Sequence, residues 1–215
     1  MFLNSYVNGL TLGSFVYILG RCLDMTLSAE SYLKLMAENG ELLNDGLKAS
    51  RKNLLGIGPV IYSVVDVMCV NHTLYFSFMQ MSNIIIIHSI GYYIVHFAMH
   101  QSKNLKKYHN FHHKFDTMII PSIGNAVSTE EFCSAYMLPF IVGATLVGPS
   151  SSSFVGGVGL ISVFNLIIHC KELEHVKLLE MFVSPKKHIL HHKTQVKHYS
   201  APILDLEYLF AKCKD

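Results

Sequence analysis

The sequence has no tryptophan and little charge. Only 15% of its 215 residues are Asp, Glu, Lys or Arg, against roughly 25% in an average soluble domain. The formal net charge of +2 gives no reason to expect nucleic acid as a partner. Its five cysteines include no C-x-x-C pair, which argues against both a disulfide framework and a thiolate zinc site. What remains to be explained is a chain that is 51% hydrophobic.

Charge is absent from three long stretches. Residues 1–20 and 132–170 carry no charged side chain, and residues 53–102 carry only Asp66. These runs reach or exceed the roughly 18–20 residues that cross the hydrocarbon core of a bilayer. The first run lacks the basic start and cleavage site of a signal peptide, so it predicts an N-terminal membrane helix. We therefore expect an integral membrane protein.

Polar breaks divide the two later runs into helix pairs. Asn71-His72 interrupts the first run, and Pro149 with the four serines after it interrupts the second. Each run is long enough for two antiparallel helices of membrane length. The predicted spans are 54–70, 73–94, 132–148 and 154–168.

The fold class expected is all-α, with two transmembrane hairpins, the N-terminal membrane helix and a helical cap. Residues 1–53 would supply N-terminal membrane and interfacial helices, and residues 54–215 the main domain. Gly40 and Gly46 predict that the polar part of the first region forms two short helices, with Ser28 as the N-cap.

The positions of the basic residues test this topology. If both pairs are hairpins, residues 21–53, 96–131 and 169–215 lie on one side of the membrane. All 17 Lys and Arg residues fall in these three segments, so this side is predicted to be cytosolic. The same side receives 11 of the 13 histidines.

These histidines form three boxes: H-x-x-x-H at 96–100 and H-x-x-H-H at 109–113 and 188–192. Residues three and four apart share one helix face, with Cβ atoms about 5–6 Å apart, so a box can chelate one metal or straddle two. With a lone histidine at 169 they offer nine donors, too many for one four-coordinate zinc. The candidate ligands are His96, His100, His109, His112, His113, His169, His188, His191 and His192. His198 is predicted to be a tenth ligand or a group just behind the ligands.

Other histidines carry weaker predictions. A single H-x-x-x-H in a histidine-rich chain would be weak evidence, and the coincidence of three boxes on one side carries the metal prediction. His88, inside a membrane helix, is either functional or a hydrogen-bonded packing residue. His72 and His175 are expected at the surface.

Ligand type alone does not choose among Fe, Zn, Cu and Ni. A site that faces lipid meets mostly C–H bonds, whose cleavage requires a redox metal that activates O2. The zinc hydrolase signature H-E-x-x-H is absent from the sequence. These points favour an oxidase that uses O2.

The stretch 96–115, HFAMHQSKNLKKYHNFHHKF, resembles the fatty acid hydroxylase/sterol desaturase superfamily. Members carry H-x-x-x-H followed by Tyr and H-x-x-H-H, which Tyr108 and the second box match. Members also carry a lone His before Pro-x-x-H-x-x-H-H, which His169 and the segment from Pro185 match. The resemblance covers residues 85–210.

This resemblance implies that residues 54–215 form a fatty acid hydroxylase-like domain with two Fe ions and O2 as co-substrate. It also implies a separate b-type cytochrome and its reductase as electron donor, and the endoplasmic reticulum as location in a eukaryote. The chain departs from the family at Ser89, where members carry Asp, at Phe97, where they carry Arg, and at His198-Tyr199-Ser200, where they carry Asn-Tyr-Gly. Either Glu130 or Glu131 takes the place of the family's glutamate after the second box.

Two function hypotheses follow. The first is an O2-dependent di-iron hydroxylase or desaturase of a sterol, fatty acyl or sphingoid chain in the bilayer. The alternative is a non-catalytic zinc-binding or transport protein, or a scaffold derived from this fold. A transporter needs ionisable groups along a path through the membrane, and only Asp66 and His88 fit that description.

Overall fold

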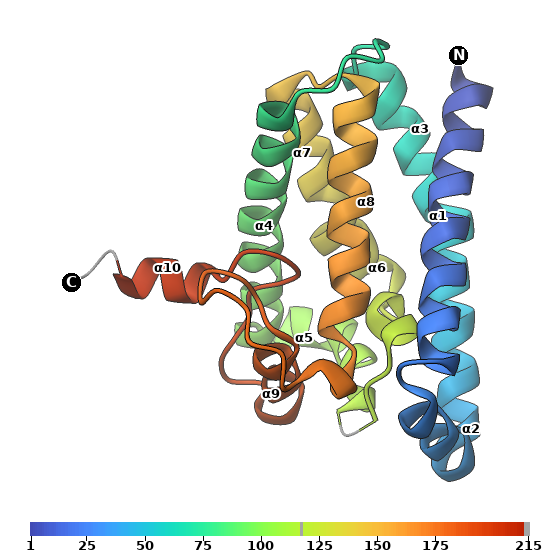
Figure 1. The fold of residues 1–215 in the computed structure, drawn as a ribbon, viewed down its shortest axis with the longest axis vertical. Helices are drawn as coiled ribbons and strands as arrows, with labels where there is room; N and C mark the ends of the chain where they lie inside the picture. The colour runs from blue at the N-terminus through green and yellow to red at the C-terminus, as the bar shows by residue number, and fades with distance from the viewer. Residues whose placement is uncertain (117, 213–215) are drawn as a thin grey trace.

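The computed structural model describes residues 1–116 and 118–212. Its regular elements there are all helices, which confirms the predicted fold class (Figure 1). The elements are α1 (Phe2–Met25), α2 (Ala29–Arg51), η1 (Lys52–Ile57), α3 (Gly58–Cys69), α4 (Phe78–Gln101), α5 (Lys103–His109), η2 (His112–Phe115), η3 (Pro121–Asn125), α6 (Thr129–Glu131), η4 (Phe132–Met137), α7 (Leu138–Val147), α8 (Ser151–Ile168), η5 (Lys171–Leu173), α9 (Pro185–Thr194) and α10 (Leu206–Lys212). Of the η elements, η1 and η4 are π-helical and the others are 3₁₀ helices.

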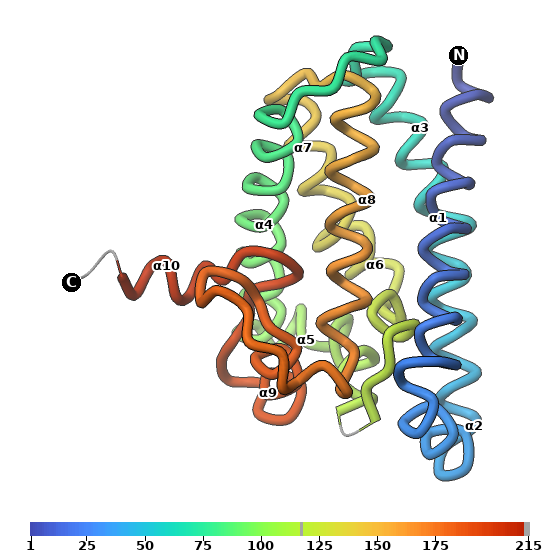
Figure 2. The backbone as a smooth tube through the Cα atoms, in the orientation of Figure 1, coloured from blue at the N-terminus to red at the C-terminus, as the bar shows by residue number. Residues whose placement is uncertain are grey.

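The long helices run up and down one bundle (Figure 2). From the N-terminus at the upper end, α1 descends, η1 and α3 ascend, α4 descends, η4 and α7 ascend, and α8 descends. The two predicted hairpin turns meet at the upper end, where the Asn71 backbone N–H donates to the Pro149 carbonyl at 2.8 Å. The short elements α5, η2 and α9 gather at the lower end.

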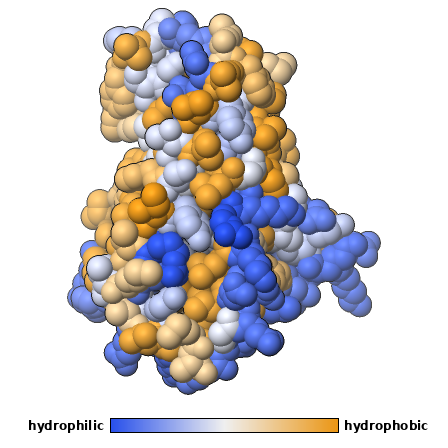
Figure 3. Space-filling model, turned by 90° about the vertical axis from the view of Figure 1, so that its right-hand side faces the viewer, coloured by the Kyte–Doolittle hydropathy of each residue, from blue (hydrophilic) through white to orange (hydrophobic). Residues whose placement is uncertain are grey.

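Four helical segments are long and apolar enough to cross a membrane: Ala29–Cys69, Phe78–Gln101, Thr129–Val147 and Ser151–Ile168. The α1 helix is not among them, although it lies along α3. On one face of the molecule, the upper part mixes hydrophobic with weakly polar residues, and strongly hydrophilic residues are more numerous lower down (Figure 3). This distribution fits a multi-pass membrane protein.

Helix boundaries differ from the prediction at several places: α4 ends at Gln101 instead of at residue 94, and α8 begins at Ser151 instead of at residue 154. α4 begins at Phe78, not at Thr73, because the Ser77 hydroxyl caps it by accepting from the Gln80 N–H at 3.4 Å. α2 has a kink at Asn39, where the backbone is not helical, so it consists of two helical parts, as the expected break at Gly40 predicted. The second predicted break, Gly46, stays helical, and its missing Cβ leaves room for the Phe115 ring, which a Cβ there would approach to 2.7 Å.

The face of α1 that packs into the bundle is small and polar. Its buried residues are Ser5, Gly9, Gly13, Val16, Gly20 and Asp24. A Cβ at Gly13 would collide with the Leu54 carbonyl oxygen, so only glycine allows this close approach of the two backbones. At the lower end, the Asp24 carboxylate accepts from the Ser122 N–H at 3.0 Å, and Ser50 donates to the Ser122 carbonyl at 2.8 Å. The first two helices thus anchor the segment that carries η3.

Candidate metal centre

Nine of the ten candidate histidines come together at the lower end of the bundle. α4 brings two, the segment from α5 to η2 brings three, the C-cap of α8 brings one, and α9 brings three. Within each of two groups, one ligand atom per residue lies within 4.8 Å of all the others. The five-histidine group is His96, His100, His109, His113 and His191, and the four-histidine group is His112, His169, His188 and His192.

Both H-x-x-H-H boxes are split between the groups. In each box the residues four apart stay together, while the third histidine turns to the other group. The rings therefore interleave: the His113 centroid lies 5.0 Å from that of His191 and 4.9 Å from that of His192. Each H-x-x-H-H box thus contributes two histidines to one group and one histidine to the other.

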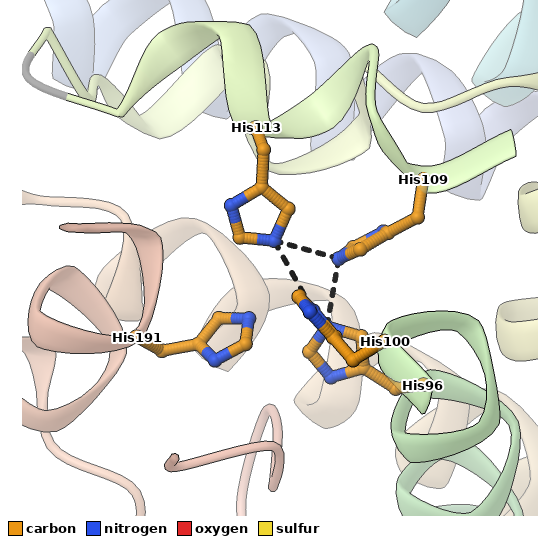
Figure 4. A group of neighbouring side chains, drawn as sticks. All are labelled: His96, His100, His109, His113 and His191. Carbon is orange, nitrogen blue, oxygen red and sulfur yellow. Dashed lines mark hydrogen bonds between the residues drawn. The ribbon is translucent and has the colours of Figure 1, made fainter. Parts of the chain in front are cut away.

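In the five-histidine group the Nε2 atoms converge (Figure 4). The Nε2 atom of His109 lies 2.9 Å from that of His96 and 2.8 Å from that of His113. The Nε2 atom of His100 lies 3.3 Å from each of the same two atoms. The His191 ring also turns toward this centre, and its buried Nε2 has no hydrogen-bond partner.

The four-histidine group is similarly compact. The Nε2 atom of His169 lies 3.4 Å from that of His112 and 3.0 Å from that of His188. The Nε2 atom of His192 lies 3.2 Å from that of His188. All four residues are buried.

Some of these Nε2 atoms carry a lone pair and no hydrogen. The Nδ1 atom of His96 faces the Tyr199 carbonyl at 2.7 Å, and that of His109 faces a Glu131 carboxylate oxygen at 2.7 Å. Both partners only accept hydrogen bonds, so each ring carries its proton on Nδ1 and a lone pair on Nε2. Two lone pairs 2.9 Å apart repel each other unless a cation lies between them.

The spacing fits a metal. A metal–imidazole bond of about 2.0–2.1 Å places neighbouring ligand nitrogens about 2.8–3.4 Å apart in octahedral or tetrahedral geometry. The N···N distances, from 2.8 Å between His109 and His113 to 3.4 Å between His112 and His169, cover this range. The residues of both groups therefore fit a bound metal ion.

Residues behind the imidazole rings orient some of the candidate ligands through hydrogen bonds. Glu131 is fully buried, and the Ser128 hydroxyl caps the helix that begins beside it by accepting from the Glu131 N–H at 3.1 Å. The neighbouring Glu130 is exposed, so of the two glutamates only Glu131 contacts a candidate ligand. Such partners fix the tautomer of a ligand and raise its basicity.

Burial keeps the imidazoles neutral. It lowers the pKa of His112, His188 and His192 well below the usual range, and neighbouring histidines lower each further. Burial lowers the pKa of His169 to about 4 and that of His191 to about 3. Neutral imidazole is the form that binds a metal.

The tenth candidate, His198, lies near His191 but is not one of the clustered ligands. The His198 ring is 3.6 Å from Glu207, and its backbone N–H donates to the same carboxylate at 2.7 Å. It belongs to neither group. His175 is exposed, as expected for a surface residue. His72 lies at the opposite end of the bundle, 3.9 Å from Asp66.

Some contacts were outside the reach of the sequence. The Nδ1 atom of His169 faces the Asn165 carbonyl at 2.6 Å, and that of His191 faces the Lys197 carbonyl at 2.8 Å. Backbone carbonyls carry no residue-type signal, so no motif could have identified them. Ser89, where the resemblance expects Asp, only donates to the Ile85 carbonyl at 2.8 Å.

Fold and site together define a helical multi-pass membrane protein with a histidine cluster that could bind metal. The chain belongs to the fatty acid hydroxylase family, whose sequence model matches residues 81–210. The match begins in α4 and ends in α10, so it includes all nine clustered histidines. Comparisons with curated proteins and with solved structures return no match. Membership supports an oxidoreductase function on lipids, in a family that is generally iron-dependent.

Proposed function

We propose that this protein is a di-iron oxygenase that hydroxylates or desaturates a lipid in the bilayer. The observation that carries the proposal is the pair of interleaved histidine groups, whose bare nitrogens converge on two separate points. Nine neutral donors suit two metals of high coordination number better than one zinc ion. The family adds the lipid and the oxidative chemistry.

The nine histidines would hold the two irons, which supply the activation of O2 needed to attack a C–H bond. The chain holds protons on the outer side of the rings. Glu131 and the carbonyl of Tyr199 keep His109 and His96 in the tautomer that turns Nε2 inward. His198 supports this arrangement from behind, because its backbone N–H and that of Tyr199 both donate to Glu207.

The position of the site in the bundle also indicates the side of the membrane on which it lies. The site lies at the end of the bundle where the basic segments gather, so we place it on the cytosolic side. In a eukaryote the membrane would be the endoplasmic reticulum, with a b-type cytochrome and its reductase as electron donor. Residues 54–215 would form the hydroxylase domain, with residues 1–53 as its N-terminal membrane and interfacial helices.

The test is reconstitution of detergent-purified protein with Fe(II) without oxygen, followed by elemental analysis. O2 uptake is then measured with reductant and a sterol, fatty acyl and sphingoid panel. We expect about two irons per chain and lipid-dependent O2 uptake that His112→Ala abolishes.

The matched control is His175→Ala, which removes an exposed histidine outside both groups and should leave both readouts unchanged. Zinc that iron cannot replace, together with no O2 uptake, would favour the zinc-binding or scaffold alternative.

A further inference from the structure

A cavity of ≈ 70 Å³ lies inside the membrane part of the bundle, between α1, α3, η4, α7 and α8. Most of its walls are apolar, including Leu12, Ile61 and Phe154. Its lining in the described part of the chain contains no Asp, Glu, Lys or Arg, and His88 is its only histidine. It has room for about five water-sized groups, so it accommodates one end or one segment of a neutral lipid.

Two lining residues have polar groups without partners. His88 is fully buried on α4, and neither ring nitrogen makes a hydrogen bond. The backbone carbonyl of Tyr136 lies near the ring, but its position does not meet the geometry of a hydrogen bond. Asn125 is also buried, and its side-chain N–H group is unpaired. An unpaired buried polar group costs roughly 1–3 kcal/mol, so two such groups in the lining of one cavity point to a ligand.

The unpaired atoms specify the chemistry of that ligand. A neutral imidazole offers one donor and one acceptor, and the Asn125 amide nitrogen offers donors only. A hydroxyl group both donates and accepts, so it satisfies either nitrogen of His88. A carboxylate cannot donate, and without a cationic partner it would carry the cost of a buried charge. A hydrocarbon would leave the imidazole unpaired.

The cavity also reaches toward the metal centre. Asn165 lines it, and the backbone carbonyl of the same residue accepts the hydrogen bond from His169 of the four-histidine group. His88 precedes the first box histidine, His96, by eight residues on one continuous helix, or about 12 Å along its axis. A lipid held at His88 is therefore long enough to extend from there to the candidate ligands.

We propose that this cavity binds the hydroxyl group of a neutral lipid alcohol, with the His88 imidazole as its hydrogen-bonding partner. The inference deepens the proposed function, on which it rests for the reaction, by narrowing the substrate class to lipid alcohols. His88 lines the cavity, whereas its neighbour Ser89 donates its hydroxyl hydrogen to the Ile85 carbonyl. His88 is thus a specificity-determining residue, not a metal ligand.

The test is a binding measurement on zinc-loaded protein, which carries out no redox turnover. Two matched pairs serve as probes: hexadecanol with hexadecane, and cholesterol with cholestane. The readout is the shift in thermal unfolding temperature as each probe is titrated, since a ligand that binds only the folded state raises it. We expect at least one alcohol to stabilise the protein more than its hydrocarbon, and the pair that responds distinguishes a chain alcohol from a sterol.

Two substitutions decide the role of His88. His88→Leu should weaken binding of the alcohol about tenfold, as expected for the loss of one buried hydrogen bond, with little change for the hydrocarbon. His88→Gln keeps a donor and an acceptor and should retain most of the affinity. Ser89→Ala, next to it on α4, is the matched control.

Equal binding of alcohol and hydrocarbon by the unmodified protein would overturn the inference. So would a His88→Leu protein that binds the alcohol as tightly as His88→Gln. Either result leaves the iron content and O2 uptake of the proposed function unaffected, so the two failures are distinguishable.

Discussion

The two histidine groups lie side by side but are held in different ways. In the five-histidine group, the outer nitrogens of His96, His109 and His191 are fixed by the Tyr199 carbonyl, Glu131 and the Lys197 carbonyl. In the four-histidine group only His169 has such a partner. The outer nitrogens of His112, His188 and His192 are buried and unpaired.

Exposure also differs. The four-histidine group is entirely buried, whereas His100 of the five-histidine group is partly exposed. Hydrogen bonds therefore orient three rings of the five-histidine group, which is open on one side, although the outer nitrogen of His113 has no partner among the described residues. The four-histidine group is enclosed, and packing positions three of its four rings. The partly exposed group is also the one with more hydrogen-bonding partners on its outer nitrogens.

The largest effect on iron content and activity should come from removing either of two adjacent histidines on α9. His191→Ala removes a ligand from the five-histidine group, and His192→Ala removes one from the four-histidine group. Each should lower iron content from about two per chain to about one and reduce lipid oxidation by more than a thousandfold, since the two metals act together. Elemental analysis and product formation measure both effects. If either variant kept two irons, the division into groups would be wrong.

A smaller effect should follow from Glu131→Gln. The amide still reaches His109 but removes the charge that strengthens this ligand, and outer partners of this kind contribute 10- to 100-fold in metal affinity. We expect one of the two irons to be removed more easily by a chelator, with the second unchanged. Glu130→Gln, an exposed neighbour, is the control. Equal weakening of both irons would contradict the separation of the two groups.

The smallest effect should be on the stability of the metal-free protein as the pH is lowered. Burial lowers the pKa of His112, His188 and His192, so the unfolded chain binds more protons than the folded chain below about pH 6.5. The metal-free protein should therefore lose stability as pH falls from 7.5 to 5.5, with a lower thermal unfolding midpoint in detergent. His192→Leu should flatten this dependence, and an unchanged slope would argue against a buried neutral ring at that position.

The sequence carried the topology and most of the site because both depend on residue type and spacing. The uncharged runs and polar breaks predicted the hairpins, and the H-x-x-H-H spacing predicted which side chains converge. His112 and His191 belong to different groups, and this division depends on how α9 and η2 lie relative to each other, which the sequence does not reveal. Likewise, nothing local showed that the glycines of α1 allow contact with Leu54, because that contact depends on how two helices meet.

The central claim is that nine histidines form two metal positions. Anomalous scattering at the iron absorption edge, from crystals of the iron-reconstituted protein, tests it most directly. Our account predicts two iron peaks, one surrounded by His96, His100, His109, His113 and His191 and the other by His112, His169, His188 and His192. A single peak shared by both groups, or a second peak outside these nine residues, would contradict it.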